Sequence, residues 1–363
     1  EFVVDDVEIN DARQVVYTVS RLVGGDVETT IRRSTGTTTV DFDTASTADA
    51  FAGPFISVGR PTMNASGRVV HVGNDGASFV SSLAERVGPD VVTGLSSLGL
   101  RPRLADDGTT VTDIAVERRC TEHPERTCSA PEATADQFFD TAIVAGDGVQ
   151  ALGSFTIAEQ RIDGWGGLSD PDISPSGDAI VFTGERNGLV GTFLALRDPA
   201  TSWQEPVAIA GPAAGASAIA DVEGSRPNIA QISGGADGPV GDRFVIAMVG
   251  RTSPTGPLGV HTVRLVVDAA TDASTPFAVE VDRSDPVIQV GDTVQGSTVA
   301  SVVLADSIAA AVTPAHPFDH WVAVHARLAD GRNAIVRAHT LAPPTSPAIA
   351  LPLAAPTSAG PQG

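Results

Sequence analysis

The residues best suited to metal chemistry form a group late in the chain, namely His316, Asp319, His320 and His325. Neutral imidazole and carboxylate groups are ligands for divalent metals, so His316, Asp319 and His320 are the candidate ligands of a divalent cation site. His320 and His325 are five residues apart, so on a straight strand they would face opposite sides. The interpretation that we favour is that these are solvated loop histidines, so we predict no metal ligand and no cofactor, with the divalent cation site as the alternative.

The two cysteines, Cys120 and Cys128, enclose a short polar segment with Pro124 near its centre. This spacing favours a disulfide, and closing so small a loop would stabilise the fold by about 2–3 kcal/mol. The alternative is a metal pair assisted by His123, which would need two further ligands. Because stable disulfides form in oxidising compartments, the cysteines favour an extracytoplasmic protein that is secreted, periplasmic or bound to the cell surface.

The sequence shows no local signature of catalysis. The Gly-x-Ser-x-Gly motif of serine hydrolases is absent. The acidic pairs Asp5–Asp6, Asp41/Asp43 and Asp106–Asp107 lack the ligand spacing of a calcium loop, and we interpret them as turn residues or as parts of a solvated face. A carboxylate pair assembled from distant loops would leave no such signature. We therefore predict no catalytic residue and expect a non-catalytic protein, with an enzyme as the open alternative.

The charge composition narrows the classes of partner. The 363 residues include 44 acidic and 23 basic ones, for a formal net charge of −21, and every basic residue is arginine. The absence of lysine excludes Schiff-base and P-loop chemistry. Nucleic acids and anionic membranes attract basic surfaces, so neither is expected as a partner, and no segment is long and apolar enough for membrane insertion. A protein partner or self-association remains.

The elements that would position these residues are strands. Short alternating or β-branched runs recur along the chain between Gly, Pro, Asp, Asn and Ser, as in 15–19, 68–72, 179–182 and 244–249. Two runs, Ser78–Arg86 and Ala305–Val312, are ambiguous between helix and strand. The sequence predicts an all-β protein.

The strands follow a repeated phrase in which a proline precedes an apolar or small residue, then a polar turn with glycine, then an apolar strand. The clearest copy is Ser169–Phe182, and two others are Gly59–Val72 and Arg101–Val111. Degenerate copies begin at Val7 and Arg226, and the last is Pro317–Val322. Repeats of this kind, which cannot bury their faces alone, are typical of a β-propeller.

The segment Asp170–Phe182, with the sequence DPDISPSGDAIVF, resembles the WD40-like (PD40-type) repeat of TolB-like six-bladed β-propellers, with Ser176 in place of an aspartate. The resemblance implies a fold and no particular chemistry, because such propellers include periplasmic partner-binding proteins and accessory domains of peptidases. Six copies predict six blades of about four antiparallel strands, with five or seven blades or an open pair of sandwiches as alternatives. The predicted repeats span residues 1–56, 57–98, 99–165, 166–222, 223–297 and 298–342. Residues Phe2–Val4 are a candidate outer strand beside the last repeat.

The C-terminal segment 343–363 carries no charge and is rich in Pro and Ala. Such a composition favours extended chain, which must lie on its own domain or on a neighbour. An extended segment can add a strand to the sheet edge of another subunit. We therefore expect a structural, protein-binding or self-assembling subunit of a cell surface or filament, whose tail docks on a neighbour. The alternatives are a hydrolase or lyase with its site at the mouth of the channel, and a metal- or carbohydrate-binding surface module.

Overall fold

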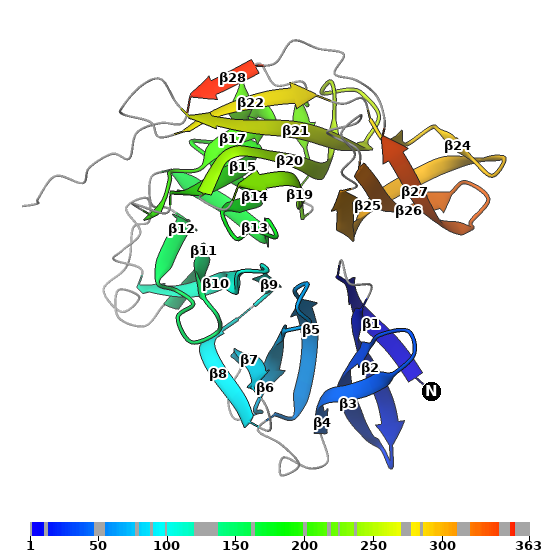
Figure 1. Ribbon diagram of the computed structural model, residues 1–363. Coiled ribbons are helices and arrows are strands. Elements are labelled where there is room, and N and C mark those ends of the chain that lie inside the picture. The colour runs from blue at the N-terminus through cyan, green and yellow to red at the C-terminus, as the bar shows by residue number, and fades with distance from the viewer. Residues whose placement is uncertain are drawn as a thin grey trace, which may run out of the picture. The chain divides into compact units, whose positions relative to one another are not determined.

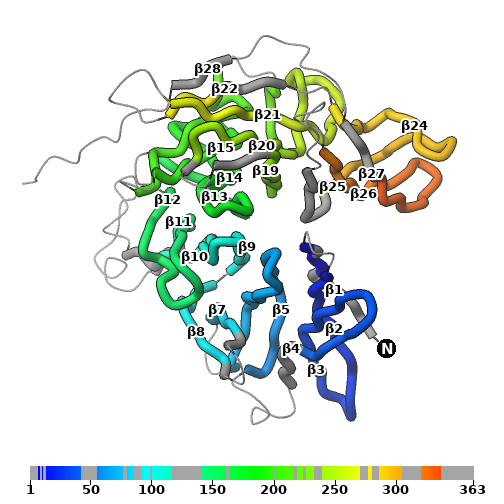
Figure 2. The backbone as a smooth tube through the Cα atoms, in the orientation of Figure 1, coloured from blue at the N-terminus to red at the C-terminus, as the bar shows by residue number. Residues whose placement is uncertain are grey.

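A computed structural model shows a chain built of β-strands, as the alternating pattern predicts (Figures 1 and 2). The structure describes residues 2–10, 14–46, 55–76, 80–87, 90–98, 100–119, 137–160, 164–198, 202–215, 219–223, 226–235, 238–269, 277–283, 286–310, 320–340 and 349–352. Within these ranges the helical element is one 3-10 turn, η2 (Pro212–Ala214). No helix in this part of the chain has the length and apolarity that a membrane span requires.

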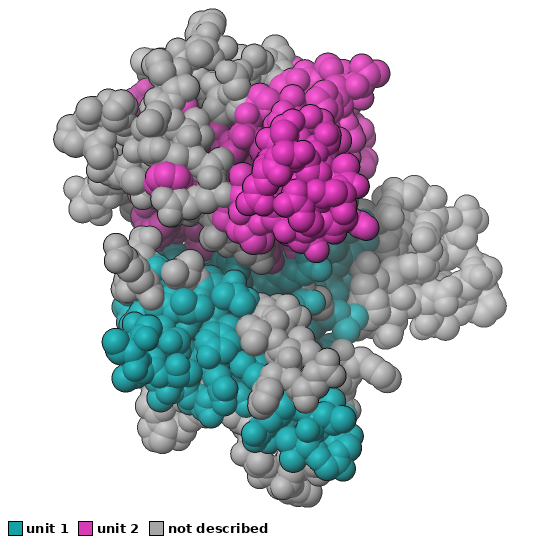
Figure 3. Space-filling model, turned by 90° about the vertical axis from the view of Figure 1, so that its right-hand side faces the viewer, with its two compact units in different colours: residues 1–168 teal, residues 169–363 magenta. Residues whose placement is uncertain are grey.

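The strands form six successive antiparallel sheets, numbered here 1 to 6 in chain order, so the fold is a six-bladed β-propeller. The chain divides into two compact units, residues 1–168 and 169–363 (Figure 3). Sheet 1 contains β1 (Phe2–Ile9), β2 (Val15–Val23), β3 (Asp26–Ser34) and β4 (Thr39–Ser46). Sheet 2 contains β5 (Ser57–Met63), β6 (Val69–Asn74), β7 (Ser81–Val87) and β8 (Asp90–Ser97). Sheet 3 contains β9 (Arg103–Leu104), β10 (Thr109–Arg119), β11 (Gln137–Asp147) and β12 (Phe155–Glu159).

The other three sheets depart more from the simple four-strand order. Sheet 4 contains β13 (Trp165–Ile173), β14 (Ala179–Arg186), β15 (Leu189–Asp198), β16 (Ser202–Trp203) and β17 (Val207–Ala210). Sheet 5 contains β18 (Asp221–Val222), β19 (Asn228–Gly235), β20 (Gly238–Arg251), β21 (Gly259–Ala269), β22 (Phe277–Arg283), β23 (Ile288–Gln289) and β28 (Ile349–Pro352). Sheet 6 contains β24 (Thr293–Val294), β25 (Ser297–Ala310), β26 (His320–Leu328) and β27 (Asn333–Thr340).

Within each unit the core lies between the faces of neighbouring sheets. Strand β20 of sheet 5 shows why some strands of this chain have a continuous run of apolar residues. Phe244, Ile246 and Met248 of β20 pack in the core that sheet 5 shares with sheet 4. Ala247 and Val249 of the same strand pack in the core shared with sheet 6. Successive side chains point to opposite faces, so a sheet covered on both sides needs apolar residues at every position.

The turn that opens the repeats has the predicted geometry. In three repeats the fourth residue of the turn is glycine with φ between +81° and +96°, a conformation that costs glycine little. Its N–H donates to the carbonyl oxygen of the first residue of the turn. The three bonds are Gly67 to Asn64 at 3.0 Å, Gly108 to Ala105 at 3.1 Å and Gly177 to Ser174 at 2.9 Å.

The strands decide three expectations that the sequence left open. The ambiguous runs are strands where they are described, in β7 and β25. The expectation that Phe2–Val4 forms an outer strand beside the last repeat is wrong, because β1 pairs with β2 in sheet 1. The copy Pro317–Val322 does not open a repeat either, because β26, the strand that follows it, is the third strand of sheet 6. The turn that opens sheet 6 is Val294–Ser297, so β24 lies before the start predicted for the sixth repeat.

Candidate functional site

The structure separates the histidines that the sequence analysis grouped. His320, the first residue of β26, is fully buried, whereas His325 lies on the opposite face of that strand, between exposed Val303 and Ile335. The two histidines therefore face opposite sides, as the strand period predicts. His316 and Asp319 lie outside the described residues. In the part of the chain that the structure describes, no three His, Cys, Asp or Glu side chains are grouped as metal ligands would be.

The acidic residues behave as turn and surface groups where they are described. Asp41 is exposed and accepts a hydrogen bond from Arg32 Nε at 2.7 Å, and this bond raises the pKa of Arg32. Asp107 accepts bonds from Thr109 within its own turn, at 2.7 and 2.8 Å. The solvated-face and turn interpretations are confirmed for these two residues. Cys120 and Cys128 lie outside the described residues, in the connection between β10 and β11, so their disulfide stays a prediction.

In residues 1–168, Glu8 of β1 receives hydrogen bonds from two other blades. Its Oε1 accepts bonds from Thr62 Oγ1 at 3.1 Å and from the Met63 N–H at 3.3 Å, both in β5. Its Oε2 accepts a bond from Arg103 Nη1 of β9 at 3.0 Å. The Glu8 and Arg103 side chains are only 17% and 11% exposed. One carboxylate therefore joins the first strands of three successive blades.

The same device recurs in residues 169–363. Asp172 of β13 stands two residues before the turn at Ser174, as Glu8 stands two residues before Asn10. Asp172 Oδ2 accepts a bond from the Ile229 N–H of β19 at 2.8 Å. The carboxylates at this repeat position therefore satisfy backbone donors of the next blade, an obligatory need for buried N–H groups. They act as ties between blades.

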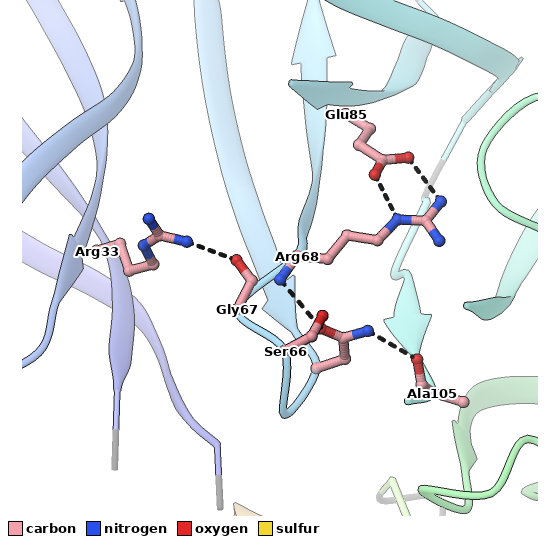
Figure 4. Close-up of polar contacts among 7 residues, drawn as sticks. Arg33, Ser66, Gly67, Arg68, Glu85 and Ala105 are labelled. Atoms are coloured by element: carbon pink, nitrogen blue, oxygen red, sulfur yellow. Dashed lines mark hydrogen bonds and ion pairs between the residues drawn. The ribbon is translucent and has the colours of Figure 1, made fainter. Parts of the chain in front are cut away.

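The turn of the second repeat is fixed by hydrogen bonds that involve three blades (Figure 4). Asn64 Oδ1 accepts from the Arg68 N–H at 3.0 Å, and Asn64 Nδ2 donates to the carbonyl oxygen of Ala105 in sheet 3 at 3.2 Å. Arg33 of β3 donates to the Gly67 carbonyl oxygen at 2.7 Å. The Asn64–Ser66 sequence, which matches a glycosylation sequon, is thus explained as a structural turn.

The guanidinium of Arg68, the residue before β6, and the carboxylate of Glu85 in β7 form a bidentate ion pair, with one bond of 2.7 Å from Nη2 (Figure 4). The hydrogen bond to Glu85 raises the pKa of Arg68. Added side chains on Gly108 or Gly148 of sheet 3 would come within 2.7 Å of this guanidinium. The ion pair is therefore packed against the neighbouring blade, and both glycines make room for it.

Two strained residues were missed by the sequence analysis. Arg60 and Asp170, both directly before proline in the first strand of a blade, have positive φ values of 48° and 43°. Such backbone outliers cluster at functional sites. Arg60 Nη1 donates to the Leu100 carbonyl oxygen at 2.7 Å, and the Arg226 guanidinium lies 3.9 Å from the Asp170 carboxylate. The available signal was the proline that directly follows each of them, Pro61 in β5 and Pro171 in β13.

The candidate binding site is the outer edge of sheet 5. There β28, from the uncharged C-terminal segment, pairs antiparallel with β22 (Figure 1). The register places Ile349 opposite Val281, Ala350 opposite Glu280, Leu351 opposite Val279 and Pro352 opposite Ala278. The predicted extended segment thus lies, at residues 349–352, on its own domain. An edge that accepts a strand can bind an extended peptide through main-chain hydrogen bonds.

The chain is similar to several solved structures, all at low sequence identity. No family model and no curated protein matches the chain. Similar solved structures include a prolyl endopeptidase (9% identity, 93% of this chain and 46% of that chain, TM-score 0.41) and an acylaminoacyl peptidase (9%, 92% and 46%, 0.37). TolB from Acinetobacter baumannii is also similar (12%, 90% and 80%, 0.25). The chain spans less than half the length of the two peptidases.

Proposed function

We propose that this chain is a non-catalytic β-propeller that binds protein partners, or copies of itself, in an extracytoplasmic surface structure or filament. The observation that carries the proposal is the pairing of β28 with the edge of β22. A segment from beyond the last blade already occupies a sheet edge of another blade. Recognition by strand addition needs only this edge and an extended apolar segment.

The polar contacts of the first strands also favour binding over catalysis. Both carboxylate oxygens of Glu8, and Oδ2 of Asp172, accept hydrogen bonds from adjacent blades. A general acid or base must instead reach the proton that it transfers to or from a substrate. The extracytoplasmic location rests on the predicted disulfide between Cys120 and Cys128, since such bonds persist in oxidising compartments.

Deleting residues 343–363 tests the proposal. We expect the full chain to form concentration-dependent assemblies, and the truncated chain to stay monomeric, when both are followed by multi-angle light scattering and electron microscopy. A chain that lacks only residues 354–363 keeps β28 and is the matched control, so it should assemble as the full chain does. Equal assembly of the full and truncated chains would refute a role for the tail.

A further inference from the structure

We propose that the edge of β22 is a strand-acceptor site that takes residues 349–352 from a second copy of this chain, by exchange of β28 between copies. This inference rests on the proposed function and names its partner and its site. The structure supplies both halves of the contact, because acceptor and donor are already paired within one chain.

The acceptor strand is well fixed on its other side. β22 pairs with β21 over seven consecutive residue pairs, from Val263–Arg283 to Ala269–Phe277. The Val279 side chain is fully buried and that of Phe277 is 5% exposed, both in the core between sheets 4 and 5. Losing β28 would therefore leave β22 in place but would expose its row of backbone N–H and C=O groups. Such an open edge can accept the β28 segment of another copy in the same register.

The donor strand is short and tethered by a proline-rich segment. β27 ends at Thr340 in sheet 6, and β28 begins at Ile349 in sheet 5. The eight residues between them include Pro343, Pro344 and Pro347. In a polyproline-like conformation, at about 3.1 Å per residue, the nine steps from 340 to 349 reach about 28 Å. β28 is the last strand in the order of sheet 5 and is paired there with β22, so its departure leaves the other strand pairs of that sheet in place.

Exchange between copies preserves the contacts. The same register forms whether β28 comes from its own chain or from a neighbour, so the two states differ chiefly in tether strain and in association entropy, as in domain swapping. The absence of charged side chains from the C-terminal segment also favours it as the donor. The chain has a net charge of −21, whereas residues 341–363 carry no charged side chain, so their approach to another copy meets less repulsion.

Site-specific crosslinking distinguishes exchange from pairing within one chain. Glu280→Cys and Ala350→Cys place thiols at directly opposite positions of β22 and β28. The two single variants are prepared separately, with Cys120 and Cys128 oxidised and the introduced thiol reduced, and are then mixed, treated with a short bismaleimide and analysed by mass. We expect a crosslinked heterodimer at a yield at least ten times that of a control mixture of Ala350→Cys with Asp330→Cys. Asp330 lies in the β26–β27 turn of sheet 6.

The double variant Glu280→Cys/Ala350→Cys, crosslinked at low concentration, reports the pairing within one chain. If it crosslinks while the mixture gives no more heterodimer than the control, β28 stays in its own chain. Exchange is then overturned, and assembly lost on truncation would point to another partner, so the proposed function survives. If neither sample crosslinks, the acceptor site itself is refuted.

Discussion

At the scale of single residues, the charged side chains fall into two classes that the sequence does not distinguish. Glu8, Asp172 and Glu85 are held by donors from neighbouring strands or blades. Asp41 and Asp330 form pairs at the surface. The first class fixes the fold, whereas exposed pairs contribute little to stability. Two substitutions test this division.

The first concerns Asp330, whose carboxylate accepts bonds from the Arg332 side chain and backbone N–H. These bonds lower the pKa of Asp330 from 3.8 to about 2. Any stability from this group is therefore fully present above pH 3.8 and is lost as the pH falls through about 2. We expect Arg332→Gln to return the pKa of Asp330 toward 3.8, measured by NMR titration of the carboxyl carbon. Arg327→Gln, a nearby exposed arginine, should leave it near 2.

The second concerns the ion pair of Arg68 with Glu85, whose side chains are 32% and 10% exposed. Glu85→Gln keeps the shape but removes the charge that supports two bonds, so we expect a loss of roughly 1–2 kcal/mol in the free energy of unfolding. Glu28→Gln is the matched control, because its partner Arg21 is 47% exposed. The control should change stability by less than about 0.5 kcal/mol. Equal effects in guanidinium denaturation would contradict the division.

At the scale of elements, the turn before the second strand of each blade was the most predictable feature. Its geometry is local, because a glycine with positive φ and an Asn or Ser side chain that accepts from the backbone can be read within five residues. The sixth repeat shows the limit of that signal. Val294–Ser297 makes the turn with Gln295 and Gly296 at φ values of 50° and 78°, and it has no proline. Pro317, which matches the proline of the repeated phrase, instead falls between β25 and β26 along the chain.

Gly67 offers a test of the turn as an element. Its φ is +81°, and an added Cβ would lie 2.7 Å from Gln14 Oε1 and 3.1 Å from Arg33 Nη1. We expect Gly67→Ala to cost about 2 kcal/mol or more, from backbone strain together with a displaced neighbour. At Gly24, with φ +63° and no atom within 4 Å, alanine should cost only the strain, about 1 kcal/mol. Chemical denaturation that ranks the two variants the other way would contradict this account.

At the scale of the whole chain, the sequence predicted an all-β propeller but not where its tail lies. The pairing of residues 349–352 with 278–281 joins segments about 70 residues apart, and no local pattern encodes a partner at that distance. Composition predicted only that an uncharged, proline-rich segment needs a surface to lie on. The placement of His320 and His325, by contrast, follows from a local pattern, because alternation along β26 sends His320 to the core and His325 to the other face.

The extracytoplasmic location of the chain is predicted from its two cysteines, so their oxidation state tests that prediction. If Cys120 and Cys128 form a disulfide, neither thiol of the native protein should react with iodoacetamide, and both should react after reduction under denaturing conditions. Reduction, or the double change Cys120→Ser/Cys128→Ser, removes a small closed loop and should lower stability by about 2–3 kcal/mol. Calorimetry would show this as a fall of several degrees in Tm. A metal pair predicts the opposite pattern: a chelator should lower Tm, and both cysteines should be alkylated without a reductant. That result would remove the support for an extracytoplasmic location.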